Sequence, residues 1–329
     1  MSWQPTMDWH HAKQRSQVLS LIRLFFSERD VIEVDTPLLS SSSVTDPHLD
    51  AFVTHFNYSA ESHCSESTVL YAQTSPEFAM KRLLASGYGC CYQICKAFRH
   101  EQQGRYHNPE FTMLEWYRLG FNHFDLMDEV EELMQLILKC DKIERISYQA
   151  LFINKVNLDP LNTNINELIG VITQFDKLSD WLQEEESVDT LLQFIMAELI
   201  EPDIEPAISQ HQPCFVYDFP ASQASLAKIS SKDIRVAERF ECYYKGVELA
   251  NGFNELTNVE QQKLRFMQDN DLRKQLGKPT LEIDENFIAA LEQGLPACAG
   301  VALGIDRLVM IALSVNKIDD VITFPLSNA

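Results

Sequence analysis

The chain has 329 residues, of which 45% are hydrophobic and 23% are charged, and its formal net charge is −21. Nucleic acid is bound through cationic surface, so this acidic balance argues mildly against a nucleic-acid partner. No stretch reaches the length of a membrane span and no charged-then-apolar leader is present, so we expect a cytoplasmic protein without a membrane partner.

The N-terminal part of the chain predicts a helix followed by a short strand. Residues 12–28 carry apolar side chains at helical spacing. Residues 31–34 are typical of a strand, and Pro37 stops it.

A second helix is predicted over residues 77–85. Ser75 is expected to cap it, with Pro76 as its first residue. The helix dipole by itself explains an acid such as Glu77 in the first turn.

A charged hairpin is predicted next. Apolar runs over residues 90–98 and 110–117 enclose a long polar loop, and long loops of this kind are often functional. Arg99 and Arg105 can each hold phosphate oxygens, and Glu101 can accept from an amine. The alternative is a solvated hairpin with surface salt bridges.

The middle of the chain predicts mostly helices. Residues 124–138 form an amphipathic pattern whose acids suit a solvated face. Residues 147–203 look like a helical insertion and carry no recognisable chemistry. Residues 213–219 are typical of a buried strand, and the small residues 220–227 would suit a wall close to a ligand.

A pair of acidic residues is predicted on a second hairpin. Lys245-Gly246 favours a tight turn that places Tyr243 opposite Glu248. Strand alternation then puts Glu241, Tyr243 and Glu248 on one face. Neighbouring carboxylates repel each other unless a cation lies between them, and carboxylates together with phosphates suit Mg²⁺.

The C-terminal part predicts two polar helices, over residues 259–277 and 285–293. A strand over residues 300–303 then passes through Gly304, which allows a close backbone approach, into a last helix. Arg307 lies in the first turn of that helix.

Three segments resemble the three motifs of class II aminoacyl-tRNA synthetases. Residues 27–39 (SERDVIEVDTPLL) resemble motif 1, with Asp30 where the family usually has glycine. Phe98-Arg99-x-Glu101 and its return strand, residues 108–117, resemble motif 2. Residues 300–310 (GVALGIDRLVM) resemble motif 3. Each motif alone is weak, whereas all three in order, over nearly the whole chain, are specific.

The resemblance is closest to the lysyl branch and implies an α+β fold, an antiparallel sheet flanked by helices. It also implies ATP and Mg²⁺ as cofactors and a homodimer formed through motif 1. The alternative for the motif 1 helix is packing on the core of its own chain. His100 stands where asparagine is common, a minor departure.

The same resemblance implies the residues of the site. Arg99 and Arg307 would be catalytic, with adenine between Phe111 and Arg307. The residues expected to bind ATP are Arg99, His100, Glu101, Asn108, Phe111, Glu248, Leu249, Gly304 and Arg307. The residues expected to bind the amino acid are Ser75, Pro76, Glu77, Glu115, Tyr117, Glu255 and Ala302. The residues expected to bind Mg²⁺ are Glu241 and Glu248.

Two departures favour a relative that modifies a protein. Motif 1 already begins at Ser27, so we expect no anticodon-binding domain and a single catalytic domain over residues 1–329, with the helical insertion near 147–203. Ala302 stands where lysyl-tRNA enzymes carry glycine, and the paralogues that modify elongation factor P carry alanine. One methyl group is worth about 1–3 kcal/mol in discrimination, enough to favour an amine on the β-carbon.

The resemblance therefore predicts an ATP-dependent ligase. It would activate (R)-β-lysine as an adenylate and transfer it to the ε-amine of a lysine on elongation factor P, with no tRNA partner. Two alternatives stay open: a truncated lysyl-tRNA synthetase-like enzyme that charges RNA, and an inactive lysine-sensing paralogue. The presence of both site arginines and the acidic residues disfavours the inactive form.

Overall fold

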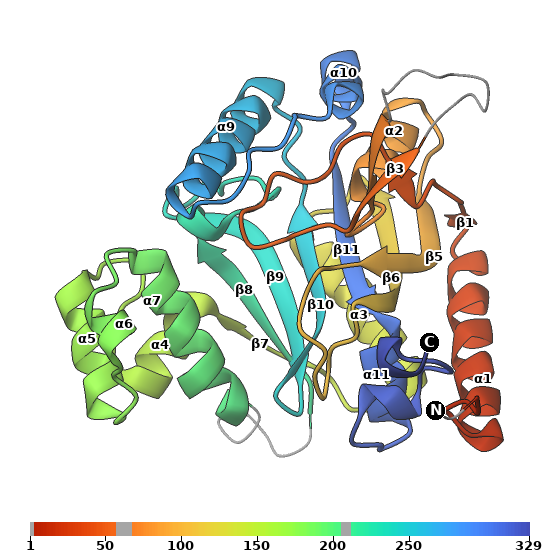
Figure 1. Cartoon of the computed structure of the whole chain (residues 1–329), viewed down its shortest axis with the longest axis horizontal. Coiled ribbons are helices and arrows are strands. Elements are labelled where there is room, and N and C mark those ends of the chain that lie inside the picture. Colours follow the sequence, from red (N-terminus) through yellow and green to blue (C-terminus); the bar gives the residue numbers. More distant parts are fainter. Residues whose placement is uncertain (1–2, 57–67, 205–211) are drawn as a thin grey trace. The chain divides into compact units, whose positions relative to one another are not determined.

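Figure 1 shows the computed structural model, which describes residues 3–56, 68–204 and 212–329. The chain divides into two units. The first combines Met1–Gly120 with Leu256–Ala329, and the second is the continuous segment Phe121–Glu255.

The first unit is built on strands in the order β1-β5-β6-β11. β1 runs parallel to β5, whereas β6 is antiparallel to both β5 and β11. A small separate sheet has the order β2-β4-β3. The strands are β1 (Ile32–Glu33), β2 (Leu39–Ser40), β3 (Val53–Phe56), β4 (Thr68–Ala72), β5 (Cys91–Phe98), β6 (Glu110–Leu119) and β11 (Cys298–Gly304).

The helices of the first unit bury apolar faces in a common core. Phe78 of α2 stacks on Phe287 of α10 with ring centroids 4.4 Å apart. Phe26 of α1 stacks on Tyr92 of β5 at 4.4 Å. The helices are α1 (Trp9–Ser27), α2 (Glu77–Ala85), α9 (Val259–Gln275), α10 (Glu285–Gly294) and α11 (Ile305–Ala312), with short turns η4 (Ile318–Asp320) and η5 (Leu326–Asn328).

The second unit is built on strands in the order β10-β9-β8-β7. β7 runs parallel to β8, and the other neighbours are antiparallel. The elements are α3 (His123–Leu138), β7 (Glu144–Ser147), α4 (Tyr148–Val156), α5 (Ile165–Gln174), α6 (Asp180–Gln183), α7 (Val188–Ile195), η1 (Met196–Ile200), η2 (Glu201–Asp203), β8 (Cys214–Pro220), η3 (Ala221–Gln223), β9 (Val236–Tyr244) and β10 (Val247–Asn254).

Helices α4–α7 gather in one group within this unit (Figure 1). Their buried side chains form one apolar cluster that includes Phe152, Leu191 and, from β8, Val216. The helices expected over residues 147–203 are therefore present, while their status as an insertion stays a prediction. The α+β class is confirmed; the strand pairs are antiparallel except for the parallel pairs β1–β5 and β7–β8.

Positive φ values at three residues explain two local sequence choices. Lys245 and Gly246 have φ values of +53° and +68°, as a two-residue hairpin turn requires, and Tyr243 pairs with Glu248 as predicted. Asp30 has φ +53°, which is the reason that glycine suits this position before the strand. Asp is one of the residues that tolerate this left-handed region.

The bounds of α2 are as predicted, but its capping residue differs from the prediction by one position. Pro76 occupies the N-cap position and Glu77 is the first helical residue. The Ser75 hydroxyl still accepts a hydrogen bond from the Glu77 amide at 3.0 Å, so it satisfies a helix donor from one position further out. No helix among the described residues is long and apolar enough to cross a membrane.

A buried ion pair ties α11 to α1 and β6. Asp306 lies 2.6 Å from the Arg15 guanidinium and accepts a hydrogen bond from the Thr112 amide at 2.6 Å. The carboxylate is 2% exposed, so its charge depends on these two partners.

Replacing Arg15 with methionine should lower the free energy of unfolding by about 3–5 kcal/mol, because it leaves a buried carboxylate without its counter-ion. The matched control is Arg23→Met, which removes the exposed pair with Glu33 and should cost at most about 1 kcal/mol. Denaturant unfolding of both variants gives the comparison, and equal losses would contradict the role of the buried pair.

Candidate active site

The carboxylate of Glu115 is the centre of a buried cluster of polar side chains in the first unit, where the amino-acid pocket is predicted. It accepts hydrogen bonds from the Ser75 hydroxyl at 2.8 Å and the Tyr117 hydroxyl at 2.7 Å. The residue is 2% exposed. Three of the residues expected to bind the amino acid are thus in direct contact, and Pro76 is the next residue after Ser75.

A buried cation lies beside Glu77 in the same pocket. The Lys81 ammonium donates to Glu77 Oε1 at 2.5 Å, one helical turn along α2. The Lys81 side chain is 1% exposed, and its Nζ lies 6.0 Å from the ring centroids of Tyr117 and Phe287. The Glu77 carboxylate in this pocket is therefore already paired with the Lys81 ammonium group.

The electrostatics of the pocket favour an incoming cation. Burial, followed by the repulsion of Glu77, raises the pKa of Glu115 to about 7. The hydrogen bonds from Tyr117 and Ser75 and the charge of Lys81 act in the opposite direction. A substrate ammonium would favour the ionised carboxylate, because an opposite charge stabilises the charged form.

Strand register places Ala302 directly beside this pocket. Ala302 of β11 pairs with Glu115, which in turn pairs with Gln93 of β5. Directly opposite residues of antiparallel strands share one face of the sheet. Gln93 is 1% exposed, and its amide has no hydrogen-bond partner among the described residues. The methyl group of Ala302 thus lies next to the acid expected to hold an amine.

The motif 2 loop supplies a second group of polar residues. The Arg99 guanidinium lies 5.3 Å from the centre of the Phe111 ring. Its buried Nε has no hydrogen-bond partner within the described part of the chain. The amide of His100 donates to the Asp50 carbonyl at 2.8 Å, and the amide of Glu101 to the Arg99 carbonyl at 2.8 Å. This backbone holds Arg99 beside an aromatic face.

Arg307 is held by the same loop. It donates to His107 Nε2 at 2.8 Å and to the Tyr106 carbonyl at 3.3 Å. Partial burial, followed by the Arg307 charge, lowers the pKa of His107, while the charge of Glu101 opposes this shift. A neutral His107 can accept the Arg307 hydrogen bond, so the loop orients this guanidinium.

Asn108 and Gly304 complete the predicted ATP residues of the first unit. Asn108 is buried, donates to the Glu110 carbonyl at 2.6 Å and accepts from the Leu326 amide at 3.0 Å. Gly304 has φ −75°, and a Cβ there would meet only the Arg307 side chain, at 3.7 Å or more. If glycine is required at position 304, the reason would therefore be the close approach of a ligand to the backbone.

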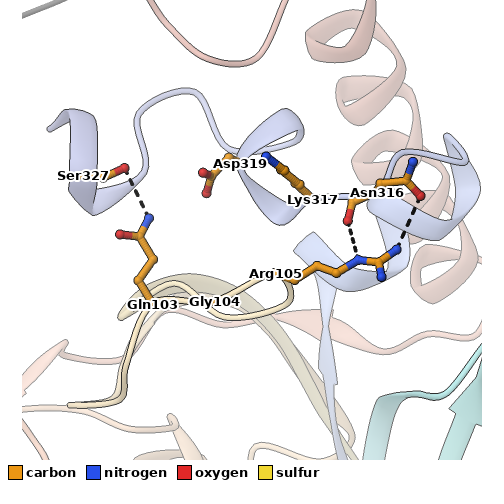
Figure 2. A pocket seen from close by; sticks show the side chains of 7 residues that line it. All are labelled: Gln103, Gly104, Arg105, Asn316, Lys317, Asp319 and Ser327. Atoms are coloured by element: carbon orange, nitrogen blue, oxygen red, sulfur yellow. Dashed lines mark hydrogen bonds between the residues drawn. The ribbon is translucent and has the colours of Figure 1, made fainter. Parts of the chain in front are cut away.

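Arg105 takes a different place from the one suggested by its charge. Figure 2 shows it turned toward Asn316, to which it donates at 2.8 Å through Nε, and Gln103 turned toward Ser327 at 3.3 Å. These contacts border an open cavity of about 600 Å³. The cavity is lined by Gln103, Gly104, Arg105, Asn316, Lys317, Asp319 and Ser327, of which only Arg105 was considered from the sequence as a phosphate ligand.

The second unit carries the acids expected to bind Mg²⁺. Glu241 is buried and accepts hydrogen bonds from Arg239, Tyr243 and, at 3.2 Å, Asn251. Glu248 pairs with Tyr243 across the hairpin, on the same face as Glu241.

The donor set fits Mg²⁺ only together with phosphates. No group of three or more metal-ligating side chains occurs among the residues that the structure describes. Mg²⁺ is commonly held by one or two carboxylates plus substrate phosphates, which suits the pair Glu241 and Glu248.

The other two predicted residues of this unit lie on or next to β10. Leu249 falls at a β-bulge, because Glu248 pairs with Tyr243 while Ala250 pairs with Cys242. Glu255 is 3% exposed and forms a backbone bridge with Ala227. Ala227, the last residue of the small-residue segment 220–227, therefore lies beside Glu255.

Three charged or polar residues of these groups were not predicted from the sequence. Lys81 stands four residues after Glu77, a spacing that signals an ion pair on a helix. Arg239 stands two residues before Glu241, on the same face of β9. The bond from Arg307 to His107 has no local signal, because 200 residues separate the two.

Comparison with known proteins identifies the family of this chain. Proteins named elongation factor P–(R)-β-lysine ligase are 53% identical in Vibrio campbellii, 54% in Photobacterium profundum and 51% in Edwardsiella ictaluri. The matches cover 98%, 99% and 100% of this chain and 98%, 99% and 98% of those proteins. The family described as tRNA synthetases class II (D, K and N) matches residues 6–328. The chain therefore belongs to the class II tRNA synthetase family, whose members are ATP-dependent ligases.

Proposed function

We propose that this chain activates (R)-β-lysine with ATP and transfers it to a lysine side chain of elongation factor P. The observation that carries the proposal is the similarity of 50–54% identity, over nearly the full length, to proteins named for this reaction. The buried acidic residues around Glu115, beside Ala302, support it because a carboxylate there can bind an ammonium group of the substrate.

The first step is formation of an adenylate. The substrate carboxylate attacks the α-phosphorus of ATP and pyrophosphate leaves, a reaction governed by positioning and by neutralisation of charge. Arg99 and Arg307 supply the positive charge, and Phe111 and Arg307 are assigned to the adenine. His100, Glu101, Asn108, Leu249 and Gly304 complete the ATP contacts.

Magnesium is assigned to Glu241 and Glu248 of the second unit. When bound, it would neutralise phosphate charge. The hydrogen bonds of Arg239, Tyr243 and Asn251 fix the Glu241 carboxylate and leave it capacity to accept a further ligand.

The second step is transfer to the protein. The ε-amine of the acceptor lysine attacks the acyl carbon, an amide bond forms and AMP leaves. No side-chain nucleophile is required. Glu77, Glu115, Tyr117 and Glu255 are assigned to the two ammonium groups of β-lysine, so that its carboxyl group points at ATP.

Two further properties belong to the same proposal. The chain acts as a homodimer through α1 and β1, where Leu24 and Ile32 are exposed apolar residues. It works in the cytoplasm and uses no tRNA. A net charge of −21 sets its long-range field against a polyanion. The alternatives, charging of RNA and an inactive sensor, lack an observation that favours them.

Arg99→Ala should reduce ATP–pyrophosphate exchange by about 10²–10³-fold, because it removes one transition-state contact. Arg105→Ala is the matched control from the same loop, and it should keep most of the exchange activity because Arg105 is engaged with Asn316. Nearly normal exchange in Arg99→Ala would make Arg99 a surface residue only.

Ala302→Gly should raise the use of α-lysine relative to β-lysine, since the methyl group lies beside Glu115 in the strand register. The expected change in the ratio of kcat/KM values is at most about 10²-fold. An unchanged ratio would contradict a role of this methyl group in selecting the amine position.

The acceptor is tested by one competition experiment with labelled β-lysine, ATP, tRNA and elongation factor P together. The label should appear on elongation factor P, where intact mass also detects it, and the tRNA should remain unlabelled. Label in the RNA with the protein unmodified would reject the proposed function in favour of an RNA-charging enzyme.

A further inference from the structure

Lys81 is a buried charge that the proposed reaction does not use. Its side chain is 1% exposed, less than that of the Glu77 carboxylate with which it pairs at 15%. Burying an ammonium group is costly unless it is paired, so the ion pair with Glu77 stabilises Lys81 in this buried position. Its position between the rings of Tyr117 and Phe287 adds two aromatic faces near the charge.

The pocket therefore has a definite balance of charge. Glu77 and Glu115 contribute two carboxylates, and Lys81 contributes one cation. With both acids ionised, these three residues together carry one net negative charge. One arriving ammonium group balances that charge, and a second would make the sum of the three residues and their ligand positive.

We propose that Lys81 is a positioning residue of the amino-acid pocket: as a built-in counter-ion it fixes Glu77 and leaves the charge of one carboxylate for a single substrate ammonium group. This inference rests on the proposed function and specifies how its pocket selects an amine. The second ammonium group of a diamino acid must then be bound outside this pocket.

The inference has a consequence for pH dependence. The groups that face or neighbour Glu115 are Ser75, Glu77 and Lys81 from the α2 segment, Tyr117 from β6, and Cys91 and Cys95 from β5. Burial raises the pKa of both thiols to about 12, so both stay neutral near neutral pH. Of the groups named here, Glu77 and Lys81 place a charge next to Glu115.

Glu115 must be ionised to hold an ammonium group, so kcat/KM for the amino acid should fall as pH drops through the pKa of Glu115. Lys81 lowers that pKa and Glu77 raises it. Removing one neighbouring charge of this kind typically moves a carboxyl pKa by about 1–3 units. Loss of Lys81 should therefore move the acid limb of the profile upward, and loss of the Glu77 charge should move it downward.

The test measures ATP–pyrophosphate exchange with β-lysine as a function of pH in the full chain. Lys81→Met keeps the length and apolar stem of the side chain, and its midpoint should rise by about one unit or more. Below the midpoint, kcat/KM should fall about tenfold for each unit of that rise. Lys96→Met, which removes the half-exposed ion pair between Lys96 on β5 and Glu110 on β6, should keep the wild-type midpoint.

Glu77→Gln is the second variant and should move the midpoint in the opposite direction, because Lys81 then acts on Glu115 alone. If Lys81→Met does not fold, the midpoint of the Glu77→Gln profile tests the inference by itself. A merely structural role of Lys81 predicts lower activity or stability with unmoved midpoints, and that result overturns the inference. Failure of the proposed function is distinct: the wild-type chain itself would then show no exchange with β-lysine.

Discussion

The first unit depends on the pairing of β6 with β5 on one side and β11 on the other. This register aligns Gln93, Glu115 and Ala302 in one row across the sheet. A shift of one residue would turn every side chain of β6 to the opposite face. Glu115 would then leave Ser75, and the apolar Trp116 would take its place. The positions of the pocket side chains therefore depend on backbone hydrogen bonds between these strands, although those backbone groups take no part in catalysis.

Each unit places a cation beside an acidic residue before any substrate is present. Lys81 pairs with Glu77 in the first unit, and Arg239 pairs with Glu241 in the second. In both cases the carboxylate is confined to one orientation by a short ion pair. A pre-oriented acid loses less conformational freedom when a ligand binds, which strengthens binding without a further contact.

The sequence predicted local structure well where chain neighbours determine it. The turn at Lys245-Gly246 and the opposition of Tyr243 to Glu248 follow from residues a few positions apart, and both are confirmed. The family, the α+β class and the ligase reaction followed from three ordered motifs. The residues assigned to ATP, Mg²⁺ and the amino acid stay predictions.

Prediction was weaker where residues distant in sequence meet. The contact of Arg307 with His107 and the ion pair of Arg15 with Asp306 join segments about 200 or more residues apart, and no local pattern encodes them. The predicted bounds of α2 are confirmed, but its N-cap was placed one residue too early, at Ser75, whose hydroxyl is shared between the helix and Glu115. Its hydroxyl serves a tertiary contact that helix propensity does not contain.

The placement of β11 has a consequence for how the protein is made. β6 ends at Leu119, but its partner β11 begins only at Cys298, after the whole second unit has been synthesised. Because domains tend to fold as units during synthesis, the continuous segment Phe121–Glu255 can fold while β6 still has an unpaired edge. During that interval Met113, Leu114 and Trp116, all buried in the finished protein, are available to chaperones and to aggregation. The amino-acid pocket is therefore among the last parts of the chain to form.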